Sequence, residues 1–163
     1  MKNRIPKHWA VAGLLITASI RADAIEAPQL NKEGFWLLQT SVYTRHFSPD
    51  PDHNNRQQLI GLERNEGSGL LYGGATFRNS YDQQSTYGYV GKRFDSADYP
   101  VYVKVSGGLL HGYHDKYRDK IPFNRFGIAP VIIPSIGVHL GPVTAEAVLL
   151  GFSATMVNVG VRF

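Results

Sequence analysis

The chemistry that this sequence could carry gathers around one histidine and one serine. His46 and Ser80 each follow a stretch of mixed polar and apolar residues, and Asn79 precedes the serine. A histidine that takes a proton from a hydroxyl, with a serine or carboxamide near it, is what acyl transfer requires. The residues alone leave a second interpretation open, in which His46 is only a solvated polar group. Tyr81 and Asp82 follow directly after Ser80, and three more polar side chains lie close together further along the chain: His111, His114 and Asp115.

The elements that must position these residues are β-strands, because no helical period runs through residues 25–163. In the last segment, one face carries Thr155, Val157, Val159, Val161 and Phe163, and the other carries Met156, Asn158, Gly160 and Arg162. This two-residue period predicts a strand with one face toward lipid and one toward a polar or small-residue interior. Eight strands are predicted in all, at 35–47, 56–65, 69–79, 85–94, 99–113, 128–140, 143–150 and 154–163.

The joints between these strands alternate in length. Those after the second, fourth and sixth strands are short, whereas those after the first and fifth, at 48–55 and 113–127, are long. Outer-membrane barrels have short periplasmic turns and long extracellular loops. The alternation therefore favours an all-β fold, an eight-stranded antiparallel up-and-down transmembrane β-barrel, over a soluble sandwich. His46, Asn79 and Ser80 would all lie at its extracellular rim.

Residues 1–24 have the pattern of a secretory signal peptide that is removed. Three basic residues precede an apolar run at 9–20, and alanines at 22 and 24 stand where a signal peptidase cuts. Cleavage would leave 13 basic and 12 acidic residues, a net charge of about +1, so the charge gives no support to nucleic-acid binding. The absence of cysteine excludes a disulfide scaffold. Residues 25–163 would form the barrel in the bacterial outer membrane, although a periplasmic β-domain has the same composition.

The stretch Ala129–Val143 is the most distinctive part of the chain. It has the apolar, β-branched content of a strand but contains Pro130 and Pro134, which cannot donate to a ladder. We therefore expect the hydrogen bonding to a neighbouring strand to be interrupted there. In a membrane, such a gap is tolerated only where it serves a purpose.

This stretch resembles the proline-interrupted strand of the PagP family of outer-membrane lipid A palmitoyltransferases. The similarity has no gap and includes Pro130, Val131, Pro134, Val138, Gly141, Pro142 and Val143. Phe77–Ser80 is similar to the family's Phe-Lys-Asp-Ser segment, and Thr44–Phe47 resembles its histidine segment. The resemblance implies that a palmitoyl chain moves from a phospholipid to a lipid A hydroxyl, with no cofactor and no metal, in a protein that we expect to be a monomer.

The catalytic residues that the resemblance implies are His46, Asn79 and Ser80. His46 would be the general base, and Ser80 the hydroxyl partner or nucleophile. Asn79 departs from the family's aspartate, and an amide cannot stabilise an imidazolium by charge. Either the reaction demands less of that charge, or a nearby acid such as Asp82 substitutes.

The resemblance also implies how lipid is bound. Pro130 and Pro134 would open the wall for lateral lipid access, and Gly88 or Gly91 would form the floor of the acyl pocket. The basic residues of the long loop could meet the phosphates of lipid A: Lys116, Arg118, Lys120 and Arg125. These four alternate with acidic residues, so a solvated charged surface is the other interpretation. The chain's many strand glycines likewise predict either a slim interior cavity or only the kinks of a small barrel.

Two other functions remain as alternatives. The first is a non-enzymatic barrel with a structural or binding role. The second is a lipid A deacylase, another small-barrel enzyme with a histidine and a serine. In that family the pair lies close together near the C-terminus, and no His-x-Ser follows His139 here.

Overall fold

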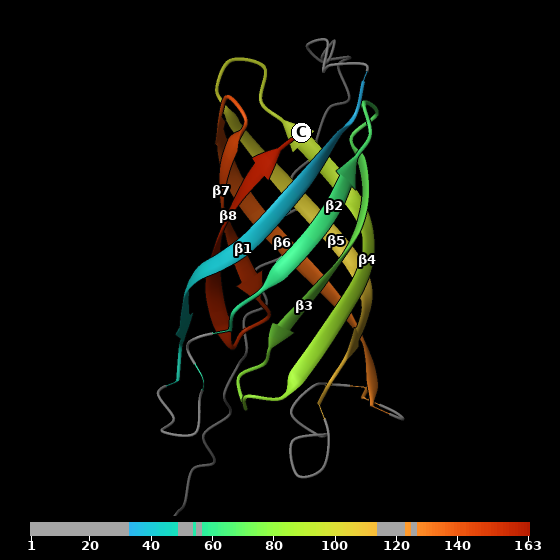
Figure 1. The fold of residues 1–163 in the computed structure, drawn as a ribbon, viewed down its shortest axis with the longest axis vertical. Coiled ribbons are helices and arrows are strands. Elements are labelled where there is room, and N and C mark those ends of the chain that lie inside the picture. The colour runs from blue at the N-terminus through green and yellow to red at the C-terminus, as the bar shows by residue number, and fades with distance from the viewer. Residues whose placement is uncertain (1–32, 49–53, 55–56, 114–122, 125–126) are drawn as a thin grey trace, which may run out of the picture.

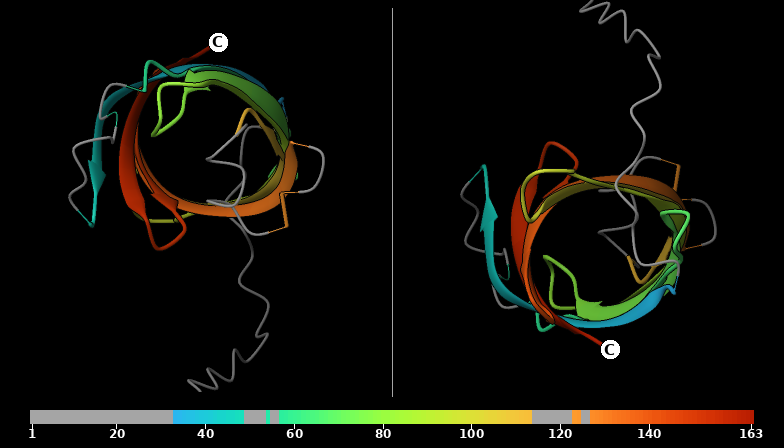
Figure 2. Two further views of the ribbon diagram at one scale, coloured as in Figure 1. Left: turned by 90° about the horizontal axis from the view of Figure 1, so that it is seen from below. Right: turned by 90° about the horizontal axis from the view of Figure 1, so that it is seen from above.

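The computed structural model describes residues 33–48, 54, 57–113, 123–124 and 127–163. These residues form a closed antiparallel barrel in which each strand pairs with its sequence neighbours and β1 pairs with β8 (Figures 1 and 2). The strands are β1 (Phe35–His46), β2 (Ile60–Asn65), β3 (Leu70–Arg78), β4 (Gln84–Asp95), β5 (Val101–His111), β6 (Ile128–Leu140), β7 (Val143–Leu150) and β8 (Ala154–Arg162). The predicted eight-stranded up-and-down barrel is therefore confirmed.

Each barrel end is made by one class of connection. We call the end with the connections after β1, β3, β5 and β7 the loop end, and the opposite end, which starts β1 and finishes β8, the turn end (bottom and top of Figure 1).

β2 begins at Ile60, later than predicted, and β5 ends at His111. The predicted signal peptide at residues 1–24 lies outside the described residues. None of the described residues belongs to a helix long and apolar enough to span a membrane.

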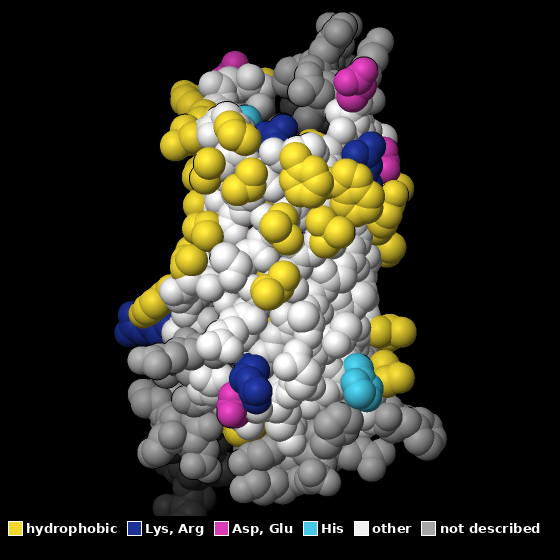
Figure 3. All heavy atoms as spheres, in the orientation of Figure 1, with side chains coloured by type: hydrophobic (Ala, Val, Ile, Leu, Met, Phe, Trp, Pro, Cys, Tyr) yellow, Lys and Arg dark blue, Asp and Glu magenta, His cyan; other side chains and the backbone are white. Residues whose placement is uncertain are grey.

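Alternation along the strands divides the wall into two faces. In β8 the inside face carries Met156 and Asn158, both buried, while Val161 lies exposed on the outside, as predicted. Exposed apolar side chains recur on the outside of the other strands, and Figure 3 shows them gathered mainly over the turn half of one face. This is the arrangement that lipid requires of a barrel wall.

A bulge in β1 explains why both faces of that strand look mixed in the sequence. The pairing of β1 with β8 shifts between Ser41 and Tyr43. Leu37 and Gln39 are buried before the shift, whereas Thr44 is buried after it. One extra residue therefore exchanges the two faces. As a result, His46 lies on the same, inner face of the wall as Thr44.

The strand ladders have two gaps at the loop end. β6 pairs with β7 only from Ser135 to Leu140, so Ile128–Pro134 has no ladder partner in β7. On its other side, β6 is paired with β5 along Ile128–Val138. The predicted interruption at the prolines is thus confirmed for the β7 side. The second gap lies between β1 and β2, because only residues up to Thr40 of β1 pair with β2.

Candidate active site

The loop end brings His46 and Ser80 together. His46 is the last residue of β1, and Ser80 lies in the connection between β3 and β4. The Nε2 atom of His46 is 2.7 Å from the Oγ atom of Ser80, in a partly buried setting. With the imidazole neutral and protonated on Nδ1, Nε2 accepts the serine proton, which is the contact that general-base activation of a hydroxyl needs.

Asn79 shapes the loop that presents Ser80. Its side chain is fully buried, and its Oδ1 accepts hydrogen bonds from the backbone amides of Tyr81 (2.9 Å) and Gln83 (3.1 Å). Its Nδ2 donates to Ser85 Oγ and to the Gly112 carbonyl, each at 3.2 Å. An asparagine side chain offers two acceptor sites and two donor hydrogens, so all four are used. Asn79 therefore has nothing left to orient His46, and the role that the resemblance implies for it does not fit these contacts.

Asp82 is directed to other partners. Its carboxylate lies 3.6 Å from Nη1 of Arg78 and accepts a 3.4 Å hydrogen bond from Asn54, and its side chain is exposed. The same arginine donates to the Asp82 backbone carbonyl at 3.0 Å. Asp82 has a positive φ of 60°. These contacts give it a part in closing the β3–β4 turn.

Tyr113, which the sequence did not single out, also reaches the site. It follows the end of β5, and its ring meets the Tyr81 ring edge-on, with 6.3 Å between the ring centroids. Burial raises the pKa of the Tyr113 phenol, and the neighbouring Ser80 lowers it by less. The phenol therefore stays protonated at neutral pH and can donate. Only its position two residues beyond β5, at the same rim as His46 and Ser80, could have drawn attention to it.

The interior next to this rim is apolar. Two clusters of buried residues line the barrel, Leu59 with Ala75, Val148 and Met156 near this rim, and Leu71 with Tyr87 and Tyr89 farther toward the turn end. Phe77 and Ile133 pack against both clusters but are only partly buried, as are Leu110, Val131 and Leu150. Apolar side chains on the inside face thus stay accessible near the loop end. The surroundings suit a hydrocarbon better than an ion.

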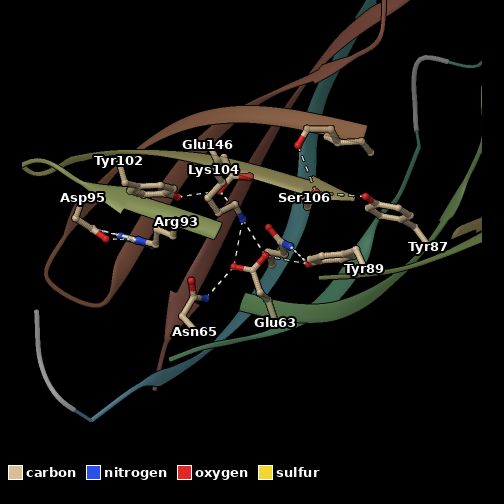
Figure 4. Close-up of polar contacts among 12 residues, drawn as sticks. Glu63, Asn65, Tyr87, Tyr89, Arg93, Asp95, Tyr102, Lys104, Ser106 and Glu146 are labelled. Atoms are coloured by element: carbon tan, nitrogen blue, oxygen red, sulfur yellow. Dashed lines mark hydrogen bonds and ion pairs between the residues drawn. The ribbon is translucent and has the colours of Figure 1, made fainter. Parts of the chain in front are cut away.

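The interior toward the turn end holds a buried network of polar side chains (Figure 4). Lys104 Nζ lies 2.9 Å from Glu63 Oε2 and 2.9 Å from Glu146 Oε2, and all three side chains are at most 6% exposed. Hydrogen bonds from Tyr89 and Asn65 to Glu63, and from Tyr102 to Glu146, complete the group. We call these six residues the interior plug: Glu63, Asn65, Tyr89, Tyr102, Lys104 and Glu146. Closer to the turn end, Arg93 pairs with Asp95 at 2.7 Å and stacks on Tyr102.

Neither of the two predicted floor glycines lines open space inside the barrel. Gly88 has the outside parity of its exposed neighbour Val90, and a Cβ added to it would meet nothing within 4 Å. Gly88 therefore cannot line the interior, and the prediction that it forms the floor of the acyl pocket is wrong. Gly91 has the inside parity, but its added Cβ would lie 2.4 Å from the Val105 carbonyl. It allows close strand contact instead. On the loop-end side of the plug, Tyr87 stacks on Tyr89 of the plug and closes the interior there.

The other predicted lipid contacts can be placed only in part. Pro130 is exposed on the outside of β6 and Pro134 is partly exposed, both within the stretch that lacks a β7 partner. The predicted phosphate contacts lie outside the described residues: Lys116, Arg118, Lys120 and Arg125. Within the described part of the chain, no three histidine or acidic side chains are arranged to hold a metal ion.

Comparisons with known proteins find structural similarity but no sequence family. No protein-family model matches the chain, and no curated protein matches it. The N-terminal β-barrel domain of Pseudomonas aeruginosa OprF is similar in structure, with a TM-score of 0.39 and 15% sequence identity, over 81% of this chain and 96% of that one. The fold of the chain follows from its own strand ladders, which make it a small eight-stranded barrel of the outer-membrane type.

Proposed function

We propose that this chain is an outer-membrane acyltransferase that moves a palmitoyl chain from a phospholipid to a hydroxyl of lipid A. The observation that carries the proposal is the 2.7 Å contact between His46 Nε2 and Ser80 Oγ at the loop end. A histidine within hydrogen-bond reach of a hydroxyl is the minimum arrangement for nucleophilic acyl transfer. The resemblance of Ala129–Val143 to the PagP family adds the substrate class.

The reaction needs only proton transfers and two ester exchanges. His46 takes the Ser80 proton while Oγ attacks the ester carbonyl of the donor phospholipid. The ester C–O bond breaks, and the lysophospholipid leaves with the proton from the imidazolium. His46 then takes the proton of a lipid A hydroxyl, whose oxygen attacks the acyl-serine. Ser80 Oγ leaves and recovers the proton, so the protein is unchanged.

The surroundings of the pair support a lipid substrate. Phe77, Leu110 and Ile133 provide accessible apolar surface inside the loop half of the barrel, where a hydrocarbon chain would be shielded from water. The ladder gaps between β6 and β7 and between β1 and β2 lie at the same end. They offer two places at which lipid could pass through the wall. The interior plug fills the barrel toward the turn end, so the proposed acyl chain would enter only from the loop half.

Acyl transfer between purified lipids tests the proposal. The protein, folded in detergent, is mixed with lipid A and a phospholipid that carries an isotope-labelled palmitoyl chain, and the lipid A mass is measured. We expect labelled lipid A from the wild type, and none from His46→Gln or Ser80→Ala. Two matched controls should keep the activity: His139→Gln at the turn end and Ser153→Ala in the β7–β8 connection.

The same assay separates the alternatives. No transfer by a folded wild-type protein would contradict the acyltransferase and favour a non-enzymatic barrel. Loss of an acyl chain from lipid A, without transfer of the label, would identify a deacylase. Transfer that persists in both His46→Gln and Ser80→Ala would place the chemistry at another site.

A further inference from the structure

Gln57 lies beside the segment that carries Ser80. β2 is placed between β1, which ends at His46, and β3, which leads to Ser80. Just before β2, the Gln57 carbonyl accepts a 2.8 Å hydrogen bond from the Arg78 amide. The Asn54 amide donates a 2.7 Å hydrogen bond to the Ser80 carbonyl. The chain that enters β2 is thus fastened on both sides of Gln57's neighbours to the strand end and loop that present the proposed nucleophile.

The side chain of Gln57 is buried, and its amide oxygen has no partner. Only 3% of the residue is exposed. Among the described residues, no group forms a hydrogen bond with its Oε1 atom. A buried polar oxygen in a folded protein is nearly always hydrogen-bonded, because burial without a partner costs the free energy of desolvation. This oxygen is therefore an acceptor that the described part of the chain leaves free for a donor from elsewhere.

The backbone beside Gln57 is strained. Gln58 has a φ of 44°, in the left-handed region that residues other than glycine rarely adopt, and its side chain is exposed. The next residue is fixed to β1, because the Leu59 amide donates a 2.9 Å hydrogen bond to Ser41 Oγ. Strained residues that their surroundings hold in place gather at binding and catalytic sites. Of two adjacent glutamines, one is thus exposed and the other is buried next to Ser80.

We propose that Gln57 binds the acceptor lipid, with its Oε1 atom accepting a hydrogen bond from an O–H or N–H group of the lipid A saccharide. The inference rests on the proposed function. Lipid A carries sugar hydroxyls and amide N–H groups, whereas the ester carbonyls and the ionised phosphate of a donor phospholipid only accept hydrogen bonds. A free acceptor atom on a residue beside Ser80 therefore suits lipid A and not the donor. Such a hydrogen bond is made before and during the chemical step, so it acts on substrate binding.

Gln57→Met keeps a long unbranched side chain but removes the amide, and Gln58→Met is the matched control at the exposed neighbour. The donor is phosphatidylcholine, which has no O–H or N–H group, and the concentration of lipid A is varied. We expect Gln57→Met to raise KM for lipid A about two- to tenfold, the size of one lost hydrogen bond, with kcat nearly unchanged. Without lipid A, the burst of lysophosphatidylcholine that accompanies formation of the acyl-serine should equal that of the wild type. Gln58→Met should match the wild type in both measurements.

The stability of the fold gives a second readout, which needs no substrate. Because the Gln57 amide is buried without a partner, an apolar side chain of similar shape should raise the midpoint of urea unfolding in Gln57→Met. An amide that served only to hold the loop together would instead lower the midpoint when it is removed.

The outcomes distinguish the two proposals. An equal KM for lipid A in the wild type and Gln57→Met, or a lower midpoint in the variant, would overturn the role of Gln57 while leaving the acyltransferase in place. A smaller burst in Gln57→Met would also overturn it, because the amide would then act on the donor. A folded wild type that transfers no palmitate would remove both proposals.

Discussion

Lys104 is the residue whose loss should most weaken the barrel. It is the cation of the interior plug, within 2.9 Å of a carboxylate oxygen on each of Glu63 and Glu146. Lys104→Met keeps a long apolar side chain but leaves two carboxylates buried without a cation. Removing one partner of a buried ion pair costs about 3–5 kcal/mol, because the remaining charge is no longer compensated. We expect the free energy of unfolding to fall by about that amount.

The reverse change should be milder. Glu63→Gln leaves Lys104 paired with Glu146, a neutral pair, and the amide oxygen can still accept from Tyr89 or Asn65. The loss should then be about 1–2 kcal/mol, the scale of a weakened hydrogen bond. The double variant, Lys104→Met with Glu63→Gln, should be less destabilised than the sum of the two single changes, since it buries one fewer uncompensated charge.

Urea unfolding in lipid vesicles measures these differences. Trp36, the one tryptophan within residues 25–163, lies at the start of β1 and reports unfolding by fluorescence. Lys92→Met is the control, because Lys92 is exposed on β4, and we expect it to change stability by at most about 0.5 kcal/mol. A Glu63→Gln variant that is destabilised as much as Lys104→Met would refute the reasoning, since charge compensation would not then govern the plug.

Three further predictions concern the site and the wall. Asn79→Asp should lower the free energy of unfolding by about 1–3 kcal/mol and should not raise transfer activity, because a carboxylate would face the Gly112 carbonyl in place of a donor. Urea unfolding and the lipid assay measure the two effects, and a gain in activity would contradict the role of Asn79 in shaping the loop that presents Ser80. Gly137→Ala should cost about 1–3 kcal/mol by urea unfolding, because the new Cβ would lie 2.3 Å from Tyr102, and an unchanged stability would show that the tyrosine moves freely. Pro134→Val restores an amide beside the ladder gap and should slow transfer without loss of stability; a rate equal to that of the wild type would show that this part of β6 does not limit lipid entry.

The fold could be predicted from the sequence because a barrel wall imposes a two-residue period on every strand. β8 shows this most clearly, and its two faces lie as its residues indicate. The prolines of β6 likewise predicted a break in hydrogen bonding, since the missing donor is a property of the residue itself. The missing amide donor of proline and the alternation of side chains along a strand can both be recognised in the sequence alone.

Other parts of the site depend on details that one sequence does not display. The bulge after Ser41 inserts a single residue, and only the pairing with β8 reveals that it turns His46 inward. In β4, Tyr87 and Tyr89 have aromatic rings that would suit either face, and their hydrogen bonds to Ser106 and Glu63 settle them inside, which puts Gly88 outside. Those partners come from other strands, so the choice of face cannot be read from β4 alone.

The most direct test of the central proposal is mass spectrometry of lipid A from Gram-negative cells that express this chain, beside cells that express His46→Ala or Ser80→Ala. The proposal predicts a gain of one palmitoyl group, about 238 Da by formula mass, that disappears in both variants while they remain folded in the membrane, as expected when the base or the hydroxyl is removed. Lipid A of unchanged mass in cells with abundant, folded wild-type protein would contradict it.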